Sequence, residues 1–510
     1  MTRPLLSSAA AVALVALPAA APALTADEVW ASWQERAAGA GVALTAGSEA
    51  KSGGTLTLSG LALAADIDDV EDVTITATMS EVSMVEDGAG GVEVMLPPSI
   101  PVTIAGSDEE GADGSALITI ALSGMSLLLS DAEGGGVTNT YAADGITISL
   151  DELTEGGEVN TDVVFAINAE TLAGRFSSTG GEQPLIESSY NLDSLGLEIA
   201  ATDPDEGGTF EMTLDMADLA SDTTGSFDVA DLVAMSPDTT LRDMLDDGFS
   251  VDGTGGVGAT NYAISAEGMP ESFTSSGSIS GISGEVVMNA ERLLYNLAYN
   301  DLEFTASGSE IPFPKVGGAL GQLAVKIGIP TTLEPGDMAL GLALRDLTVG
   351  EEIWALVDPA GQLPRDPASV ALDLSGTMKF LIDVFAMDGE DAPEDLPAEV
   401  TALDINELLL TVGGAVLEGS GAFTFDWSAP GPFGPGTPAP DGALSLSLTG
   451  AMGLMQTLEE IQLLPPQQAM MGRMALGAIA VPGDGPDTLV SEITVSPDGT
   501  ILANGSELPF

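Results

Sequence analysis

Apolar and polar residues alternate along most of this chain with a period of two, which is typical of β-strands with one solvated face. The alternation begins after Gly53 and is separated into short runs by clusters of Gly and Asp, which indicate tight turns. The clearest runs are residues 55–59, 73–78, 92–96, 117–122, 146–150, 163–167, 195–199, 210–214, 261–266 and 284–289. Because strands joined by short turns pair with their neighbours, the pattern predicts large, curved antiparallel sheets arranged as meanders.

A helix is predicted at the start of the mature chain. Thr25 and Glu28 have the spacing of a capping box, in which each residue satisfies a backbone N–H near the start of a helix. We expect this helix to run to about Ala38, with Val29, Trp30 and Trp33 on its buried side. A second, short helix is predicted over residues 236–248, with a proline at its start and a glycine at its end.

Two further helical stripes lie near the C-terminus. The first contains Leu454, Met455, Leu458 and Ile461 and ends at Pro465 and Pro466, and the second contains Met470, Met471, Met474 and Ile479. The fold class is therefore mainly β with a few helices. Flexible methionines suit an irregular core, and they also suit an adaptable apolar groove. Met455, Met470, Met471 and Met474 are the candidate groove residues.

Residues 341–376 combine a strand, a short helix, a proline-rich loop and a second strand. They hold two of the 12 basic residues, Arg345 and Arg365, each followed directly by aspartate. We favour a structural role, because arginines flanked by acids are usually already paired. The alternative is that Arg345 and Arg365, with Asp366, anchor an anionic head group.

The first 23 residues resemble an export signal. Arg3 precedes an apolar run that is too short to span a membrane, and Ala21-Pro22-Ala23 fits a cleavage site. We expect cleavage after Ala23 and a periplasmic location. The rest is expected to form two β-rich halves, residues 24–248 and 249–510, or one continuous domain.

Composition excludes several functions. The chain has no cysteine and no histidine, so disulfides, Ser-His and Cys-His catalysis and the common zinc sites are ruled out. Its 78 acids and 12 bases give a net charge of −66, which makes nucleic acid and anionic membranes poor partners. The charge is expected to form a solvated acidic surface, and the alternative is divalent cation binding.

Two motifs resemble binding sites but lack the context that such sites need. Residues 253–258 match GxGxxG, but an apolar alternating run follows them where a nucleotide site needs a helix. Residues 482–489 match a calcium-binding β-roll unit at seven of eight positions, but such units bind only in tandem. We expect a turn between a helix and a strand there, and no metal or cofactor.

Residues 358–376 resemble an uncharacterised family of exported bacterial proteins, domain of unknown function 2125. Residues 96–101, 421–427, 464–469 and 502–505 resemble it too, so the similarity extends over most of the mature chain. The resemblance implies export but no activity, cofactor or catalytic residue. In pattern only, the repeated strands also resemble long β-sheet envelope proteins that shield lipid in a groove.

The sequence thus leads to three hypotheses. The first is a non-enzymatic periplasmic protein that binds a partner or organises the cell envelope. The second is a carrier of lipid or another apolar ligand, with a groove formed by the sheet and the methionine-rich helices. The third is a hydrolase that uses carboxylates alone, as glycosidases do.

Overall fold

The computed structural model describes residues 24–66, 73–107, 113–181, 183–203, 207–227, 239–268, 271–387 and 397–508. Strands account for 63% of the structure and helices for 13%, which confirms the mainly β fold class. The export signal predicted for residues 1–23, and the start of the helix predicted at residue 236, lie outside the described residues.

The chain divides into two compact units. Unit 1 takes its described residues from Met1–Ala234, Gly253–Ser276 and Gly308–Glu310. Unit 2 takes its described residues from Met235–Asp252, Gly277–Ser307 and Ile311–Phe510. The strands β13 (Ser250–Val257) and β15 (Phe273–Ile279) lie where the chain passes from one unit to the other.

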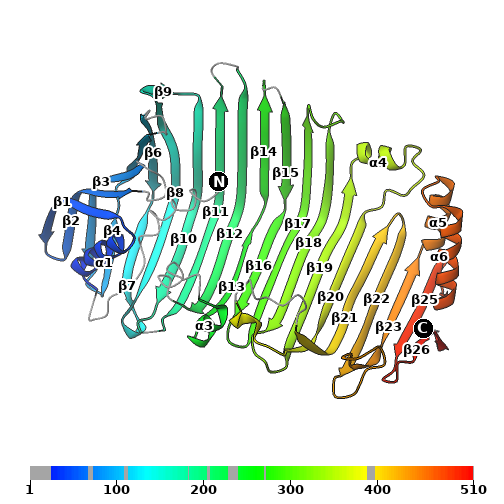
Figure 1. The fold of residues 1–510 in the computed structure, drawn as a ribbon. Coiled ribbons are helices and arrows are strands. Elements are labelled where there is room, and N and C mark those ends of the chain that lie inside the picture. Colours follow the sequence, from blue (N-terminus) through cyan, green and yellow to red (C-terminus); the bar gives the residue numbers. More distant parts are fainter. Residues whose placement is uncertain are drawn as a thin grey trace. The chain divides into compact units, whose positions relative to one another are not determined.

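Unit 1 starts with one helix, α1, and continues as antiparallel strands (Figure 1). Its elements are α1 (Ala26–Gly39), β1 (Ala43–Ser52), β2 (Thr55–Asp66), β3 (Thr74–Glu86), β4 (Gly91–Met95), β5 (Ser99–Ser107), β6 (Asp113–Ser123), β7 (Ser126–Ala132), the 3-10 turn η2 (Glu133–Gly135), β8 (Gly136–Glu155), β9 (Glu158–Asn160), β10 (Val163–Ser178), β11 (Leu185–Thr202), β12 (Thr209–Ser226) and β14 (Thr260–Glu267). Strand pairing runs from β1 through β2 and β3 to β5, β6 and β8, and then through β10, β11 and β12 to β14.

Unit 2 has the same antiparallel design with more helices. Its strands are β16 (Gly281–Met288), β17 (Arg292–Gly308), β18 (Val316–Pro330), β19 (Gly336–Val349), β20 (Ala368–Phe380), β21 (Ala398–Val412), β22 (Ala415–Asp426), β23 (Ala439–Thr449), β24 (Val481–Pro482), β25 (Thr488–Val495), β26 (Ile501–Ala503) and β27 (Ser506–Glu507). Its helices are α3 (Leu241–Asp246), α4 (Glu351–Val357), the 3-10 turn η3 (Val384–Ala386), α5 (Ala451–Glu460) and α6 (Pro466–Ile479). From β16 to β23 each strand pairs with the next in sequence, which confirms the predicted meander.

The predicted helices are present with small changes in their ends. Thr25 accepts a hydrogen bond from the Glu28 N–H and completes the expected capping box of α1. The short helix α3 begins after Thr240, which forms a second capping box with Asp243. The predicted C-terminal pair corresponds to α5 and α6, and α6 starts with Pro466, where the missing N–H costs nothing.

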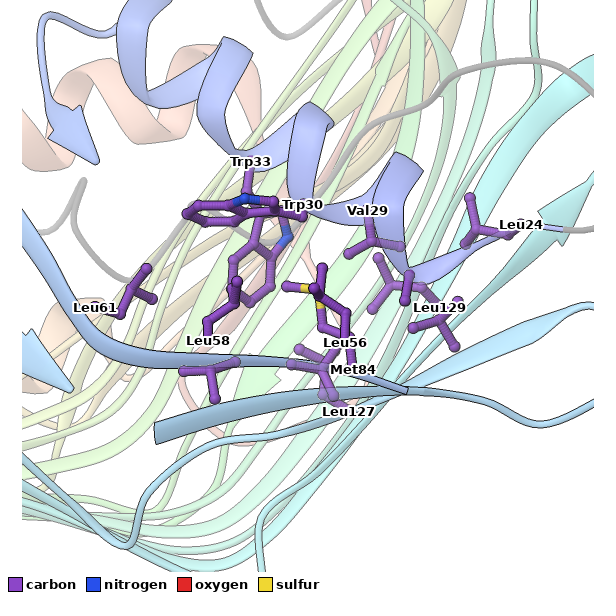
Figure 2. Close-up of a cluster of buried hydrophobic side chains, with 14 of the residues drawn as sticks. Leu24, Val29, Trp30, Trp33, Leu56, Leu58, Leu61, Met84, Leu127 and Leu129 are labelled. Atoms are coloured by element: carbon purple, nitrogen blue, oxygen red, sulfur yellow. The ribbon is translucent and has the colours of Figure 1, made fainter. Parts of the chain in front are cut away.

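The largest buried cluster of the described residues lies under α1. Trp30 and Trp33 project from α1 towards Leu56 and Leu58 of β2, as Figure 2 shows. Glu49 accepts a hydrogen bond from the Trp30 indole N–H at 3.0 Å, so the polar end of this buried ring is satisfied. Burial of each such large side chain stabilises the fold by roughly 1.5–3 kcal/mol. This cluster therefore anchors unit 1 at its N-terminal end.

A test of this anchor compares two leucines of unit 1. Leu58→Ala removes a side chain that is 0% exposed and should lower the free energy of unfolding by about 2–5 kcal/mol. Leu185→Ala is the matched control, because Leu185 is 47% exposed and should change stability by no more than about 0.5 kcal/mol. Chemical denaturation followed by tryptophan fluorescence measures both. Equal effects of the two substitutions would contradict the assignment of the core.

Candidate apolar binding face

The register of the antiparallel strands decides which side chains share a face. Successive side chains of a strand point to opposite faces, and residues paired across two strands point to the same face. A strand that alternates between apolar and polar residues therefore adds its apolar residues to one face only. In unit 2 the register repeats this alignment from strand to strand.

Three rows of paired residues cross β16–β23 and β25 of unit 2, and together we call them the apolar face. The first row is Val286, Tyr295, Ile327, Leu340, Leu374, Ile405, Gly421, Leu444 and Ile493. The second is Gly284, Leu297, Val325, Leu342, Leu372, Leu408, Gly419, Leu446 and Ser491. The third is Ile282, Tyr299, Leu323, Leu344, Val370, Leu410, Leu417, Leu448 and Leu489.

The apolar face is almost free of polar groups. Its small or polar positions are Gly284, Gly419, Gly421 and Ser491. Tyr295 and Tyr299 add two phenol rings, and every other position carries a large aliphatic side chain. Paired strands lie about 4.8 Å apart, so each row of nine residues extends over roughly 38 Å. The face is thus long and mostly aliphatic.

Side chains near the middle of the apolar face are open to solvent. Their exposed fractions run from 36% at Leu344 to 46% at Val370, and Leu340, Leu342 and Leu410 lie between these values. A sheet normally buries its apolar face against a second layer, and continuous exposed patches of this kind mark binding surfaces. The middle of the apolar face is therefore available to a ligand.

Unit 1 shows a similar row. Ile100, Ile120, Ile148, Ile167, Leu197, Leu214 and Tyr262 are paired in turn across β5, β6, β8, β10, β11, β12 and β14. All seven side chains are partly exposed. The apolar sidedness is thus a property of the long strands in both units.

The opposite side of the unit 2 sheet is polar. Asn300, Gln322 and Arg345 are paired in turn across β17, β18 and β19. Arg345 donates a hydrogen bond to Glu407 on β21, and so joins two strands that are separated by β20. This contact raises the pKa of Arg345 above its ordinary value and lowers the pKa of Glu407. This side is polar but partly buried, since Ala343 and Ala371, which are paired on it, are 9% and 1% exposed.

Both arginines that are candidate anion anchors, Arg345 and Arg365, have acidic partners within the chain. Arg365 donates to the Asp358 carboxylate at 3.1 Å and to the Asp358 carbonyl at 3.3 Å, and its guanidinium lies 4.3 Å from the centre of the Trp354 ring. It thereby ties the loop after α4 back to that helix. Among the ion pairs of the described residues, neither arginine pairs with the aspartate that follows it in sequence, Asp346 or Asp366.

The candidate groove methionines lie on the two neighbouring C-terminal helices. Met455 lies on α5 beside α6, because a Cβ added to Gly472 would meet its sulfur at 3.4 Å. Met470, Met471 and Met474 lie on α6 and are 57–68% exposed. Sequence reasoning selected these residues and missed the individual positions of the apolar face. The alternation showed that one side of the strands is apolar, but it gave no register and did not show whether a second layer covers it.

The GxGxxG-like and β-roll-like segments form parts of the fold. Residues 253–257 lie in β13, and β14 follows them instead of a helix. Asp487 of the β-roll-like segment accepts hydrogen bonds from the N–H groups of Met452 and Gly453, which lie in the first turn of α5. The described part of the chain contains no cluster of three or more potential metal ligands, and no helix there is long and apolar enough to span a membrane.

Asp358, at the end of α4, is expected to make stability depend on pH. Asp358 is 2% exposed and accepts hydrogen bonds from the backbone N–H groups of Gln362 and Leu363, which, with the Arg365 charge, lower its pKa. A lowered folded-state pKa means that the stabilisation is present above the unfolded value of about 3.9 and is lost as the pH falls through the folded value.

We therefore expect Asp358→Asn to lower the melting temperature at pH 7. The difference from the wild type should shrink as the pH falls from about 4 through the lowered folded-state pKa, because the carboxylate is protonated first in the unfolded chain and then in the folded one. Asp366→Asn is the matched control, since Asp366 makes no ion pair with Arg365, and it should leave the pH 7 melting temperature unchanged. A pH-independent difference for Asp358→Asn would refute this role of the carboxylate.

Comparison with known proteins adds a family match but no activity. No curated protein and no solved structure matches the chain. Of the segments that resemble domain of unknown function 2125, residues 96–101 lie outside the match, whereas residues 358–376, 421–427 and 464–469 lie inside it. The matched region contains every position of the apolar face. Residues 263–504 match the model of the family described as an uncharacterized protein conserved in bacteria (DUF2125).

Proposed function

We propose that this chain is a non-enzymatic binding protein that holds lipid acyl chains on the apolar face. The observation that carries the proposal is the set of three paired rows, which are apolar across nine strands and open to solvent at their centre. Water contact with such a surface is unfavourable by about 25 cal/mol for each Å² of apolar area. A bound apolar ligand removes that contact.

Acyl chains fit the chemistry of the apolar face. Most of its side chains are aliphatic, and hydroxyl groups occur only at Tyr295, Tyr299 and Ser491 of the 27 positions. A polar ligand would need hydrogen-bonding groups to fix its orientation, whereas an acyl chain needs none. Each methylene that leaves water contributes about 0.8 kcal/mol.

The dimensions of the apolar face also suit a lipid. The hydrocarbon core of a bilayer is about 30 Å thick, so one leaflet of acyl chains extends about 15 Å. A row of nine paired strands extends over roughly 38 Å and can hold more than one chain length. The proposed location is the periplasm, an aqueous compartment in which lipids need a carrier. Support for export comes from the signal-like first 23 residues.

A carboxylate-only hydrolase has weaker support. None of the 27 positions in the three rows is acidic, although the chain contains 78 acids. The carboxylate of Glu407 is engaged by Arg345 on the polar side of the sheet. The apolar face therefore favours binding over catalysis.

The proposal is tested with one acid placed on either side of the sheet. Leu342→Glu puts a carboxylate in the middle of the apolar face, where a bound acyl chain would desolvate it. Affinity for a fluorescent fatty acid should fall at least about tenfold, the equivalent of about 1.4 kcal/mol. Gln322→Glu introduces the same residue on the polar side, where it is paired with Arg345, and affinity should not change.

Native mass spectrometry gives a second measurement on the same proteins. The wild type and Gln322→Glu should carry co-purifying lipid, and Leu342→Glu should carry much less. A wild-type protein that neither co-purifies with lipid nor binds the fatty acid would overturn the proposal. Equal lipid content in all three proteins would show that the ligand lies elsewhere.

A further inference from the structure

The outer side of helix α6 carries no charged residue. Its exposed positions are Pro466, Gln467, Gln468, Met470, Met471, Met474, Ala475, Gly477 and Ala478, which we call the α6 outer face. Arg473, the one charged residue of this helix, pairs with Glu459 of α5, and its side chain is 39% exposed. A solvent-exposed helix normally has charged and polar residues on its outer side. The α6 outer face is instead suited to a less polar environment than water.

The sequence around α6 is also depleted of acids. Residues 461–483 contain no Asp and no Glu, although the chain has 78 acids in 510 residues. The segment is exposed at many positions, so burial does not explain this depletion. Acids are, however, repelled by lipid phosphates and are costly to bring close to hydrocarbon. The charge pattern therefore matches contact with a bilayer surface.

Helix α6 lies beside the apolar face. Ser491, the β25 position of the second row, donates a hydrogen bond to the Ile479 carbonyl at 2.6 Å. Asn504 donates a hydrogen bond to the same carbonyl at 3.1 Å. Helix α6 is thus tied at its C-terminal end to the edge of the apolar face, and Figure 1 shows α5 and α6 next to β25.

We propose that the α6 outer face docks on a zwitterionic lipid bilayer. Burying Met470, Met471 and Met474 in the headgroup region removes three large, exposed apolar side chains from water. A zwitterionic surface is required, because a chain with a net charge of −66 is repelled by anionic lipid. Docking brings the edge of the apolar face close to the membrane, and a role in lipid transfer there rests on the proposed function.

A folded protein partner is a poorer match for the α6 outer face. Protein interfaces draw most of their binding energy from Trp, Tyr and Arg, and the α6 outer face contains none of these residues. Methionine side chains are flexible and adapt to a fluid apolar environment without a fixed complementary shape. A bilayer is such an environment.

The test is flotation of the full chain with phosphatidylcholine vesicles. The wild type should float with the vesicles. The triple substitution Met470→Gln, Met471→Gln and Met474→Gln removes the apolar side chains without changing the net charge, and the partition coefficient should fall on the order of 100-fold. Because these side chains are exposed, the melting temperature should stay unchanged.

The matched control is Met470→Leu, Met471→Leu and Met474→Leu, which keeps the apolar surface and should float like the wild type. Flotation of the glutamine variant at wild-type levels would overturn the proposal. So would a wild type that does not float but forms a dimer that the glutamine variant loses, because the α6 outer face would then join two copies of the chain.

The two proposals fail separately in this design. Fatty-acid binding by the glutamine variant should match the wild type, since its substitutions lie outside the apolar face. Flotation without any fatty-acid binding would leave membrane docking in place and remove the proposed function. Fatty-acid binding without flotation would support the proposed function and overturn membrane docking.

Discussion

The β-register of unit 2 is the constraint on which the other features depend. A shift of one residue between two strands would move an entire set of apolar side chains to the opposite side. The structure preserves the alignment even where the spacing along a strand is irregular. Ile405 and Leu408 are three residues apart and still belong to adjacent rows, because the register shifts between them. The bulge adds one residue to β21, so that Ile405 and Leu408 both point to the apolar face.

Because side chains on one side of the sheet are exposed, other interactions must stabilise unit 2. Its strands are long, and the backbone hydrogen bonds between them satisfy the main chain without a second layer. Local contacts order the C-terminal end of the sheet. Asp487 caps the start of α5, and the short strand β24 pairs with part of β25 and covers part of its edge. Short, covered edges of this kind limit pairing with other chains. The high negative charge opposes association through the apolar face as well.

Local features of the fold could be predicted from the sequence, and long-range partners could not. The capping box of Thr25 and the order strand, helix, loop, strand in residues 341–376 depend on residues close in the chain. The partner of Arg345 is Glu407, which lies 62 residues away. Asp346 lies at an irregularity of β19 between Leu344 and Leu347, and its nearby charge contributes less to the raised pKa of Arg345 than the hydrogen bond to Glu407 does. Only the register across β20 identifies Glu407, and a single sequence does not contain it. For the same reason, alternation predicts that an apolar side exists but not what covers it.

The distribution of charge differs between the chain as a whole and the C-terminal helix α6. A chain that exposes an apolar face this long in water risks aggregation, and a net charge of −66 counters that risk by mutual repulsion. The same charge would also repel the protein from anionic membranes, where the proposed lipid ligands would be found. A local exception is therefore required wherever the chain approaches lipid. Residues 461–483 are such an exception, since they lack acids and present methionine, alanine and glutamine outwards. Because Ser491 ties this segment to the edge of the apolar face, the acid-free surface lies where lipid transfer would need it.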